Sequence, residues 1–582
     1  MTSRVVRPRR RPAWAIREAA AVPDSRRAAP AEVGLDGDDG WDQREETSQA
    51  LGVAGWTLVS RITGLARVAV VGATLGPTFF ANIFQATNTV PNLTYNLMAG
   101  SLLAALFVPA LVRALEHEGA RAARRLAQGL LTVVIVGFSL AGAVVVGLGP
   151  LIVYLLTLGI SDGATAAQAR GQAWALLLLV VPQIILYGVA AVGVAAQNAR
   201  RRFALAAAAP AVENLGLIVT LVLVAYWFGA GLDTEAVTTQ EIVVLGVGST
   251  LAVAAHAGLQ LVGAARAGMP LWPAWGWRDP AVRDIARRII PSIGTATIEA
   301  GRIFALVVVA GTVRGGVVAL QIGINFYNLP LALGSRAIGT VLMPRLSSES
   351  VHGKFDGFGR TYSRGLAQAW FVAVPASVAL VLFARPIAEA LSFGQLGRGN
   401  GTALVTASIA GMGIALVGAA TYEIARQATY ARLDVRSPLV AGLVQFVVVL
   451  AAISVVATAS EGAVTLLCLG LAVTVGDLIR AVLVDRAARR GIPNCAHPPW
   501  RTLGRQLAVT AIAIVPATVL TRFVLAVIGG QAGAIAGVAL GCLTGLVGYL
   551  ALQAHLGAPE LRGLRRVQPL AATSSVQSET MP

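Results

Sequence analysis

Several arginines lie inside apolar stretches of this sequence, where a charged side chain is unusual, and four of them are considered first. Arg61 and Arg67 share one stretch, and Arg302 and Arg336 lie in two later ones. Because an ionisable residue inside a membrane span is energetically costly, each of the four is a candidate functional residue. The planar guanidinium group pairs with phosphate through two parallel hydrogen bonds. These arginines therefore favour an anionic, phosphate-bearing ligand.

The spacing of these arginines limits the site that they can form. Arg61 and Arg67 are six residues apart, which in an α-helix is about 9 Å along the axis and about 120° around it. They can line two sides of a wide cavity but not one narrow stripe. Arg302 has Glu299 three residues before it, so the alternative for this arginine is an intrahelical ion pair that lowers its own insertion cost.

Four amide side chains recur along one predicted helix, at Asn82, Asn88, Asn92 and Asn96. Four amides facing lipid would be energetically expensive, so we expect this helix to face a polar interior. Pro91 removes a backbone hydrogen bond in the middle of the helix and should bend it. Packing against neighbouring helices explains one or two of the amides, but less readily all four.

Carboxylates are rarer than arginines in the apolar stretches. Glu213, beside Asn214, is expected to hydrogen-bond a neighbouring helix, and Asp477 with Arg480 forms a predicted structural pair. A proton- or sodium-coupled exporter of cationic drugs would need a buried carboxylate as its coupling site. The sequence shows no nucleophile–base or metal-binding constellation, so we expect neither an enzyme nor a cofactor.

The composition indicates a membrane protein. Of 582 residues, 56% are hydrophobic and 13% are charged, with a mean hydropathy of +0.70, whereas roughly a quarter of a soluble protein is charged. A net charge of +17 would suit nucleic acid. The arginines nevertheless lie in short loops between apolar runs, so we expect no nucleic-acid partner. Three cysteines are too few for a disulfide framework or a zinc site.

The expected fold is an all-α polytopic membrane protein with about fourteen transmembrane helices. Each span needs about 20 mostly apolar residues. Candidate stretches start near Ser48, Phe79, Gln128, Gly171, Phe203, Glu241, Arg288, Val317, Gly365, Thr402, Leu439, Val464, Gln506 and Gly533. Because this count is even, both termini should lie on the same side of the membrane.

Arginines accumulate in alternate loops, for example at Arg124 and Arg125 and again at Arg489 and Arg490. By the positive-inside rule these loops are cytoplasmic. The pattern predicts a multi-pass protein of the cell inner (cytoplasmic) membrane with both termini cytoplasmic. Residues 1–47 and 557–582 are polar and are predicted to be cytoplasmic tails, the first of them disordered.

An internal repeat relates two parts of the chain. Leu106-Phe107-Val108-Pro109 matches Val341-Leu342-Met343-Pro344, about 235 residues later, and Arg67 corresponds to Arg302 at the same spacing. We interpret residues 48–270 as an N-terminal lobe of six spans and residues 280–490 as a parallel C-terminal lobe, followed by two spans in 505–556. Transporters built this way bind substrate between the halves. Chance similarity of short apolar segments is the alternative.

A set of short motifs follows in order along the chain. They are Ser60-Arg61 with Gly64 and Arg67, Pro91-Asn92-Leu93, Phe107-Val108-Pro109, Ala337 through Pro344, and Tyr430-Ala431-Arg432 with Asp434 and Ser437-Pro438. Together they resemble the MurJ/MviN family of lipid II flippases, in the multidrug/oligosaccharidyl-lipid/polysaccharide exporter superfamily. The resemblance implies two six-helix lobes, two further C-terminal helices and a cavity open to one side. It also implies translocation of undecaprenyl-diphosphate-linked peptidoglycan precursor (lipid II) to the outer leaflet.

The sequence departs from the family at positions that are charged there. These positions are Val68, Asn82, Tyr95-Asn96 and Asn325 here. The resemblance carries Arg61, Arg67 and Arg302 over as residues facing the diphosphate, and Arg336 is an extra charge that could compensate. Asn82, Asn88, Asn92, Asn96 and Asn325 complete the candidate substrate-binding set, with the amides expected to contact sugar or peptide.

The expected function is therefore lipid II flipping in peptidoglycan synthesis and cell-wall biogenesis. The expected partners are a lipid-linked oligosaccharide diphosphate as substrate, membrane lipids and proteins of cell-wall synthesis. Three alternatives stay open: a flippase for another polyprenyl-linked glycan, a cation-coupled small-molecule antiporter, and a non-transporting scaffold that acts through its tails. The antiporter would make Glu213 or Glu299 indispensable and the arginines dispensable.

Overall fold

The computed structural model describes residues 39–98, 100–276, 280–289, 293–492 and 499–561. All regular structure within these ranges is helical, as the composition predicts. The chain divides into two units between Leu51 and Gly52, and α2 through α21 belong to the second. The predicted tails lie outside the described residues up to residue 38 and from residue 562 onwards.

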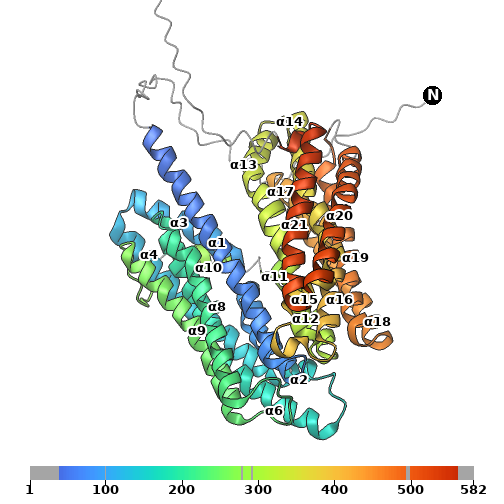
Figure 1. The fold of residues 1–582 in the computed structure, drawn as a ribbon. Coiled ribbons are helices and arrows are strands. Elements are labelled where there is room, and N and C mark those ends of the chain that lie inside the picture. The colour runs from blue at the N-terminus through green and yellow to red at the C-terminus, as the bar shows by residue number, and fades with distance from the viewer. Residues whose placement is uncertain (1–38, 99, 277–279, 290–292, 493–498, 562–582) are drawn as a thin grey trace, which may run out of the picture. The chain divides into compact units, whose positions relative to one another are not determined.

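The helices follow one another with short connections (Figure 1). They are α1 (Asp39–Leu75), α2 (Phe79–Met98), α3 (Gly100–His117), α4 (Ala120–Gly147), α5 (Gly149–Leu156), α6 (Gly163–Val180), α7 (Pro182–Ala199), α8 (Ala204–Phe228), α9 (Thr239–Arg266), α10 (Pro280–Ile289), α11 (Ile293–Gly311), α12 (Gly316–Leu331), the π-helical turn η3 (Ala332–Arg336), α13 (Ala337–Val351), α14 (Phe355–Leu382), α15 (Ala384–Leu391), the 3-10 turn η4 (Gly394–Gly397), α16 (Gly401–Ile414), α17 (Leu416–Ala431), α18 (Arg436–Ala459), α19 (Gly462–Arg489), α20 (Trp500–Ile528) and α21 (Gly530–His555). Glycines with positive φ, such as Gly229 at 97° and Gly529 at 69°, end α8 and α20, because only glycine adopts this backbone conformation without strain.

Helix lengths repeat between the two parts of the chain. α4 has 28 residues and precedes α5 with 8, just as α14 with 28 residues precedes α15 with 8. α8 and α9 have 25 and 28 residues, and α18 and α19 have 24 and 28. The repeat predicted from short motifs is thus also a repeat of helices. We call α1–α9 the N-terminal repeat and α11–α19 the C-terminal repeat.

Most of the expected spans are long apolar helices. Among the described residues, eleven helices are long and apolar enough to cross a membrane, or up to twelve if the bent pair α16 and α17 counts as one span. The expected stretches near Phe79 and Arg288 are helical, as α2 and α11, but are not among these. Both carry polar residues, the amides in α2 and the Glu299–Arg302 pair in α11. The eleven or twelve helices are close to the fourteen transmembrane helices expected, but they do not confirm that number.

Loops predicted to share a side of the membrane contact one another. Arg124, before the third predicted span, donates to the carbonyl of Gly268, after the sixth, at 3.4 Å. Loops of the other predicted side also meet, since Asp233 forms an ion pair with Arg314. A single miscounted span between the two members of a pair would have placed them on opposite sides. These contacts agree with the predicted sides of the loops between residues 124 and 314.

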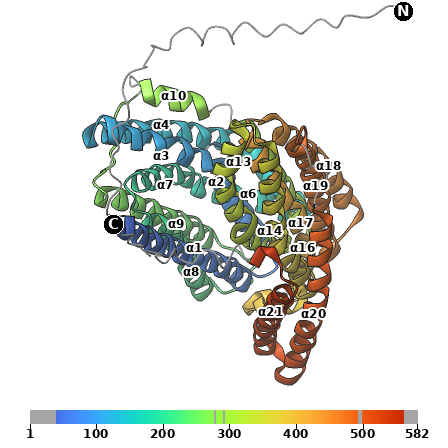
Figure 2. The same cartoon turned by 90° about the horizontal axis from the view of Figure 1, so that it is seen from above.

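The last two helices, α20 and α21, pair with each other and pack on the C-terminal repeat (Figure 2). Thr521 on α20 donates to the carbonyl of Gly537 on α21 at 3.0 Å. A Cβ atom at Gly541 would come within 2.0 Å of the Thr521 hydroxyl, so the glycine permits the close approach. Tyr549 then donates to the carbonyl of Phe371 on α14 at 3.0 Å. The expected C-terminal helix pair is present.

Candidate functional site

In the N-terminal repeat, Arg67 reaches a carboxylate inside the helix bundle. Its Nη1 lies 3.9 Å from Oε1 of Glu213 on α8. The other oxygen, Oε2, lies 2.7 Å from Nδ1 of His256 on α9. The next residue, Asn214, donates to the carbonyl of Ser60 on α1 at 3.2 Å. The hydrogen bond to a neighbouring helix that we expected for this segment is confirmed.

Tyr187 on α7 links the same carboxylate to the amides of α2. Its hydroxyl donates to Glu213 Oε1 at 2.9 Å and accepts a hydrogen bond from Asn92 Nδ2 at 3.2 Å. The ring of Tyr95 packs against Tyr187 with 5.9 Å between centroids. A continuous chain of polar contacts therefore connects Arg67 with Asn92, two of the predicted binding residues. We call Arg67, Glu213, His256, Tyr187 and Asn92 the N-terminal network.

In the C-terminal repeat, Arg302 forms the intrahelical ion pair considered as its alternative. Its Nη2 lies 2.5 Å from Oε1 of Glu299. Arg480 on α19 approaches the other oxygen of Glu299 at 3.8 Å, so two guanidinium groups share one carboxylate. The guanidinium of Arg480 also lies 3.8 Å from the centroid of the Tyr422 ring on α17. This cation–π contact holds the charge in place without neutralising it.

Asp477 is the second carboxylate of the C-terminal repeat and is fully buried. It receives hydrogen bonds from Arg480 at 2.7 Å, Tyr327 at 2.6 Å and Gln445 at 2.6 Å. A buried charge needs such compensation because its desolvation is expensive. The predicted structural pair of Asp477 and Arg480 is confirmed, and it extends into a larger cluster. We call Arg302, Glu299, Arg480, Asp477, Tyr327 and Gln445 the C-terminal network.

The two networks share one plan. In each, an arginine from the first long helix of the repeat meets a carboxylate, and a tyrosine hydroxyl donates to a carboxylate. The positive charges of Arg67 and Arg302 are therefore each accompanied by a carboxylate. A guanidinium has five N–H donors, so both arginines retain donors for a second anionic partner.

Two other predicted arginines are less engaged. Arg61 is exposed on α1, and its guanidinium group has no hydrogen bond or ion pair with any residue that the structure describes. Arg336 closes the π-helical turn η3, is exposed, and donates to Asn328 Oδ1 at 3.2 Å. π-helical turns inside α-helices occur frequently at functional sites. These two guanidinium groups are the ones open to an incoming anion.

Asn82 has a different environment from the other amides of α2. It is buried, donates to the carbonyl of Val313 at 2.7 Å and accepts from the amide of Val317 at 3.0 Å. Both its amide nitrogen and its oxygen are thus occupied by the turn between α11 and α12. Asn82 joins the two repeats, and a substrate could bind its side chain only after this contact opens.

The remaining predicted amides are spread over several environments. Asn88 Oδ1 accepts a hydrogen bond from Gln183 Nε2 at 3.5 Å. Asn96 is exposed, and Asn325 donates to the carbonyl of Gln321 in its own helix at 2.8 Å. Of the amides that we predicted to contact substrate, only Asn92 belongs to one of the two networks.

Sequence reasoning missed two members of the N-terminal network, His256 and Tyr187. His256 is an ionisable residue within a predicted span, so the rule that selected the arginines could also have selected it. Tyr187 carries no charge and follows an apolar run, so nothing in its local sequence marks it. Only the packing of α7 against α2 and α8 gives this tyrosine its role.

Comparison with known proteins assigns the family. The profile of the family described as lipid II flippase MurJ matches residues 71–530. The chain belongs to this family. The match includes all of α2 through α20 and begins after Arg61 and Arg67, so these two arginines lie outside it.

Individual relatives carry the same family name. The chain is 26% identical over 396 residues to the "Lipid II flippase MurJ" of Burkholderia cenocepacia, covering 67% of this chain and 74% of the relative. It is 27% identical over 406 residues to the "Probable lipid II flippase MurJ" of Vibrio cholerae, covering 68% and 74%. These relatives are flippases by name, so the family consists of transporters and not of enzymes.

Solved structures show the same fold. A structure titled "Lipid II flippase MurJ, inward closed conformation" aligns with a TM-score of 0.63 and 17% identity, covering 87% of this chain and 99% of that one. An inward-facing MATE family transporter of the MOP superfamily aligns with a TM-score of 0.57 and 14% identity, covering 76% and 98%. At these identities the similarity concerns the fold alone. The expected fold of a multi-pass flippase is confirmed.

Proposed function

We propose that this protein translocates lipid II, the diphosphate-linked peptidoglycan precursor, across the cytoplasmic membrane. The observation that carries the proposal is the pair of arginine–carboxylate networks, one in each repeat of a membrane protein of this family. A diphosphate offers oxygens in the geometry that guanidinium groups prefer. Arg61, Arg67, Arg302 and Arg336 would bind these oxygens, and Asn82, Asn88, Asn92, Asn96 and Asn325 would provide amides for sugar or peptide.

The pairing of the arginines suggests how binding and release are balanced. A phosphate that approaches Arg67 competes with Glu213 for the same donors, because that carboxylate lies 3.9 Å away. Such competition weakens substrate binding but lets the substrate leave on the other side. Arg61, which has no partner among the described residues, would make the first contact.

Alternating access would come from movement of the two lobes, residues 48–270 and 280–490, with residues 505–556 attached to the second. The loop charge supports cytoplasmic termini. With that orientation, Asn82 and the Asp233–Arg314 pair lie towards the outer side and hold the lobes together there. Opening these contacts would expose the site to the outer leaflet. Cell-wall synthesis proteins are the expected partners.

Complementation tests the proposal directly. A strain depleted of its own lipid II flippase should grow when it expresses this protein, and it should fail with Arg61→Ala or Arg67→Ala at equal membrane levels. Arg266→Ala, an exposed arginine at the end of α9, is the matched control and should complement. Growth with both Arg61→Ala and Arg67→Ala would contradict the assigned binding roles. Failure of the well-expressed wild type would indicate another polyprenyl-linked glycan.

A further inference from the structure

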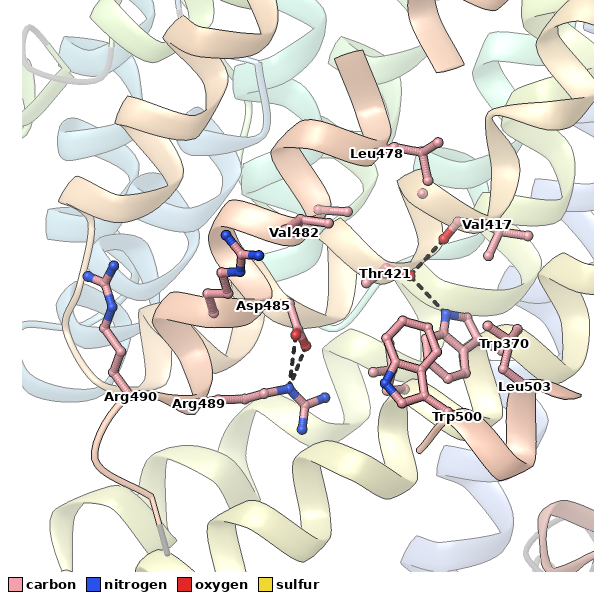
Figure 3. A pocket seen from close by; sticks show the side chains of 14 residues that line it. Trp370, Val417, Thr421, Leu478, Val482, Asp485, Arg489, Arg490, Trp500 and Leu503 are labelled. Atoms are coloured by element: carbon pink, nitrogen blue, oxygen red, sulfur yellow. Dashed lines mark hydrogen bonds and ion pairs between the residues drawn. The ribbon is translucent and has the colours of Figure 1, made fainter. Parts of the chain in front are cut away.

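A cavity of about 670 Å³ lies among α14, α17, α19 and the start of α20 (Figure 3). It belongs to neither of the two networks. One wall is aromatic and aliphatic, and the other carries arginines from the end of α19. A cavity with one apolar wall and one cationic wall matches an amphipathic anionic molecule.

Two tryptophans build the aromatic wall. Trp370 is buried and donates through Nε1 to Thr421 Oγ1 at 2.8 Å, which fixes its orientation. Trp500, at the start of α20, stacks on it with 6.4 Å between ring centroids and 23° between planes. Trp500 is 60% exposed, so its other surface is open to a ligand. Figure 3 shows the two indoles side by side at one end of the cavity.

Three arginines form the cationic wall, and they differ in their partners. Arg489 is bound to Asp485 through its Nε at 2.8 Å (Figure 3). Arg486 and Arg490 are exposed, and neither guanidinium group has a hydrogen bond or ion pair with a residue in the part of the chain that the structure describes. Their positive charge is therefore available to an anion.

The position of the cavity along the helices suits the membrane interface. It lies at the end of α19, where the chain carries the arginines that mark a cytoplasmic loop. Tryptophan is enriched where headgroups meet acyl chains, and arginine side chains extend from there to the headgroups. Leu478 and Val482, which also line the cavity, are 46% and 45% exposed and continue its apolar wall outwards.

We propose that this cavity binds one anionic phospholipid of the inner leaflet. Its phosphate would lie between Arg486 and Arg490, and an acyl chain would run over Trp500 and Val482. Basic pockets between membrane helices on the cytoplasmic side recognise anionic lipid headgroups through the same chemistry. The bound lipid would join α20 to α19, and so hold the C-terminal helix pair against the C-terminal repeat. The site does not depend on the proposed transport function.

Lipid binding to the purified full-length protein tests the site. Native mass spectrometry with dioleoyl phosphatidylglycerol and with dioleoyl phosphatidylcholine compares two lipids that differ only in headgroup. The wild type should prefer phosphatidylglycerol about tenfold, and R486Q/R490Q should remove this preference. The matched control, R266Q/R360Q, removes two exposed arginines outside the cavity and should keep it.

Further variants separate the two walls. Trp500→Ala should weaken the binding of both lipids several-fold, because it removes apolar contact and not charge. Equal affinity of the wild type for the two lipids would overturn the proposal, and so would a preference that survives in R486Q/R490Q. A dimer that depends on Arg486 and Arg490 would also overturn it, since a second copy would then occupy the cavity. If the double variant aggregates, Arg486→Gln and Arg490→Gln are tested singly, each with about a threefold smaller preference.

Discussion

Nδ1 of His256 lies 2.7 Å from Oε2 of Glu213, across the contact between α8 and α9. The other oxygen of this carboxylate, Oε1, accepts a hydrogen bond from the Tyr187 hydroxyl and lies 3.9 Å from Nη1 of Arg67. Glu213 therefore connects a candidate substrate-binding arginine to a histidine on another helix. A change at Glu213 must affect Arg67 even though the two residues are far apart in sequence.

Glu213→Gln should separate charge from hydrogen bonding in the N-terminal network. Glutamine is isosteric and can still accept a hydrogen bond from Tyr187, but it leaves the half-buried charge of Arg67 without a counter-charge. We expect the free energy of unfolding to fall by about 1–3 kcal/mol, the usual cost of leaving a buried polar group without its partner. Equilibrium unfolding in detergent measures it. The double variant Glu213→Gln/Arg67→Gln should recover part of the loss, and a purely additive result would contradict the pairing.

Arg302→Ala should be more damaging than Arg302→Lys. Alanine leaves Glu299 with Arg480 alone, at 3.8 Å, whereas lysine keeps a positive charge. Lysine cannot reproduce the two-donor contact that Arg302 makes through Nε and Nη2, so it should restore stability but not complementation. Membrane protein levels and growth of a flippase-depleted strain measure the two effects. Full growth with Arg302→Lys would show that a point charge suffices.

Asn82→Ala should weaken the junction between the repeats. The substitution removes the partners of the Val313 carbonyl and the Val317 amide, and buried backbone groups left without partners cost about 1–3 kcal/mol. Reduced thermal stability of the purified protein is the expected result. Asn96→Ala, an exposed amide on the same helix, is the control and should change little. Equal changes in stability for the two substitutions would contradict this role of Asn82 at the junction.

Gly470→Ala should disrupt the packing of α19 on α16. A Cβ atom at Gly470 would lie 2.4 Å from the backbone carbon of Gly411, so the two helices would have to separate. Overpacking of this kind typically costs about 1–3 kcal/mol. Gly442→Ala, where an added Cβ meets nothing within 4 Å, should be neutral or slightly stabilising. Thermal unfolding of the two variants side by side measures the difference.

The loop before α18 should respond to acid through Asp434. Burial raises the pKa of this carboxyl group, but hydrogen bonds from Ser437, including its amide at 3.0 Å, outweigh it and lower the pKa. A lowered pKa in the folded state means that the stabilisation is present at neutral pH, above the unfolded value, and is lost as the pH falls through the folded value. Asp434→Asn should therefore be less stable than wild type at pH 7. The difference should shrink below about pH 4, as unfolding at a series of pH values will show.

Much of the fold could be predicted from local properties of the sequence. The apolar runs, the alternating loop charge and the repeat of Arg67 at Arg302 each depend on residues read in order along the chain. They predicted an all-helical membrane protein with two repeats and a C-terminal helix pair. The predicted span near Phe79 differs because its amides lower the hydropathy of α2 below that of a typical span. Amide side chains that face neighbouring helices can hydrogen-bond there, so a helix that carries them can have a lower hydropathy.

The sequence by itself determined the class, most of the spans and the candidate arginines, since insertion into a membrane depends on the hydropathy and charge of each segment. The partners of those arginines were decided only by the tertiary structure. Glu213 and His256 meet because α8 packs on α9, and Asn82 meets Val313 because the two repeats touch there. The hydrogen bonds and ion pairs that tune a charge form between helices distant in sequence, and their energies depend on distances that no local pattern contains.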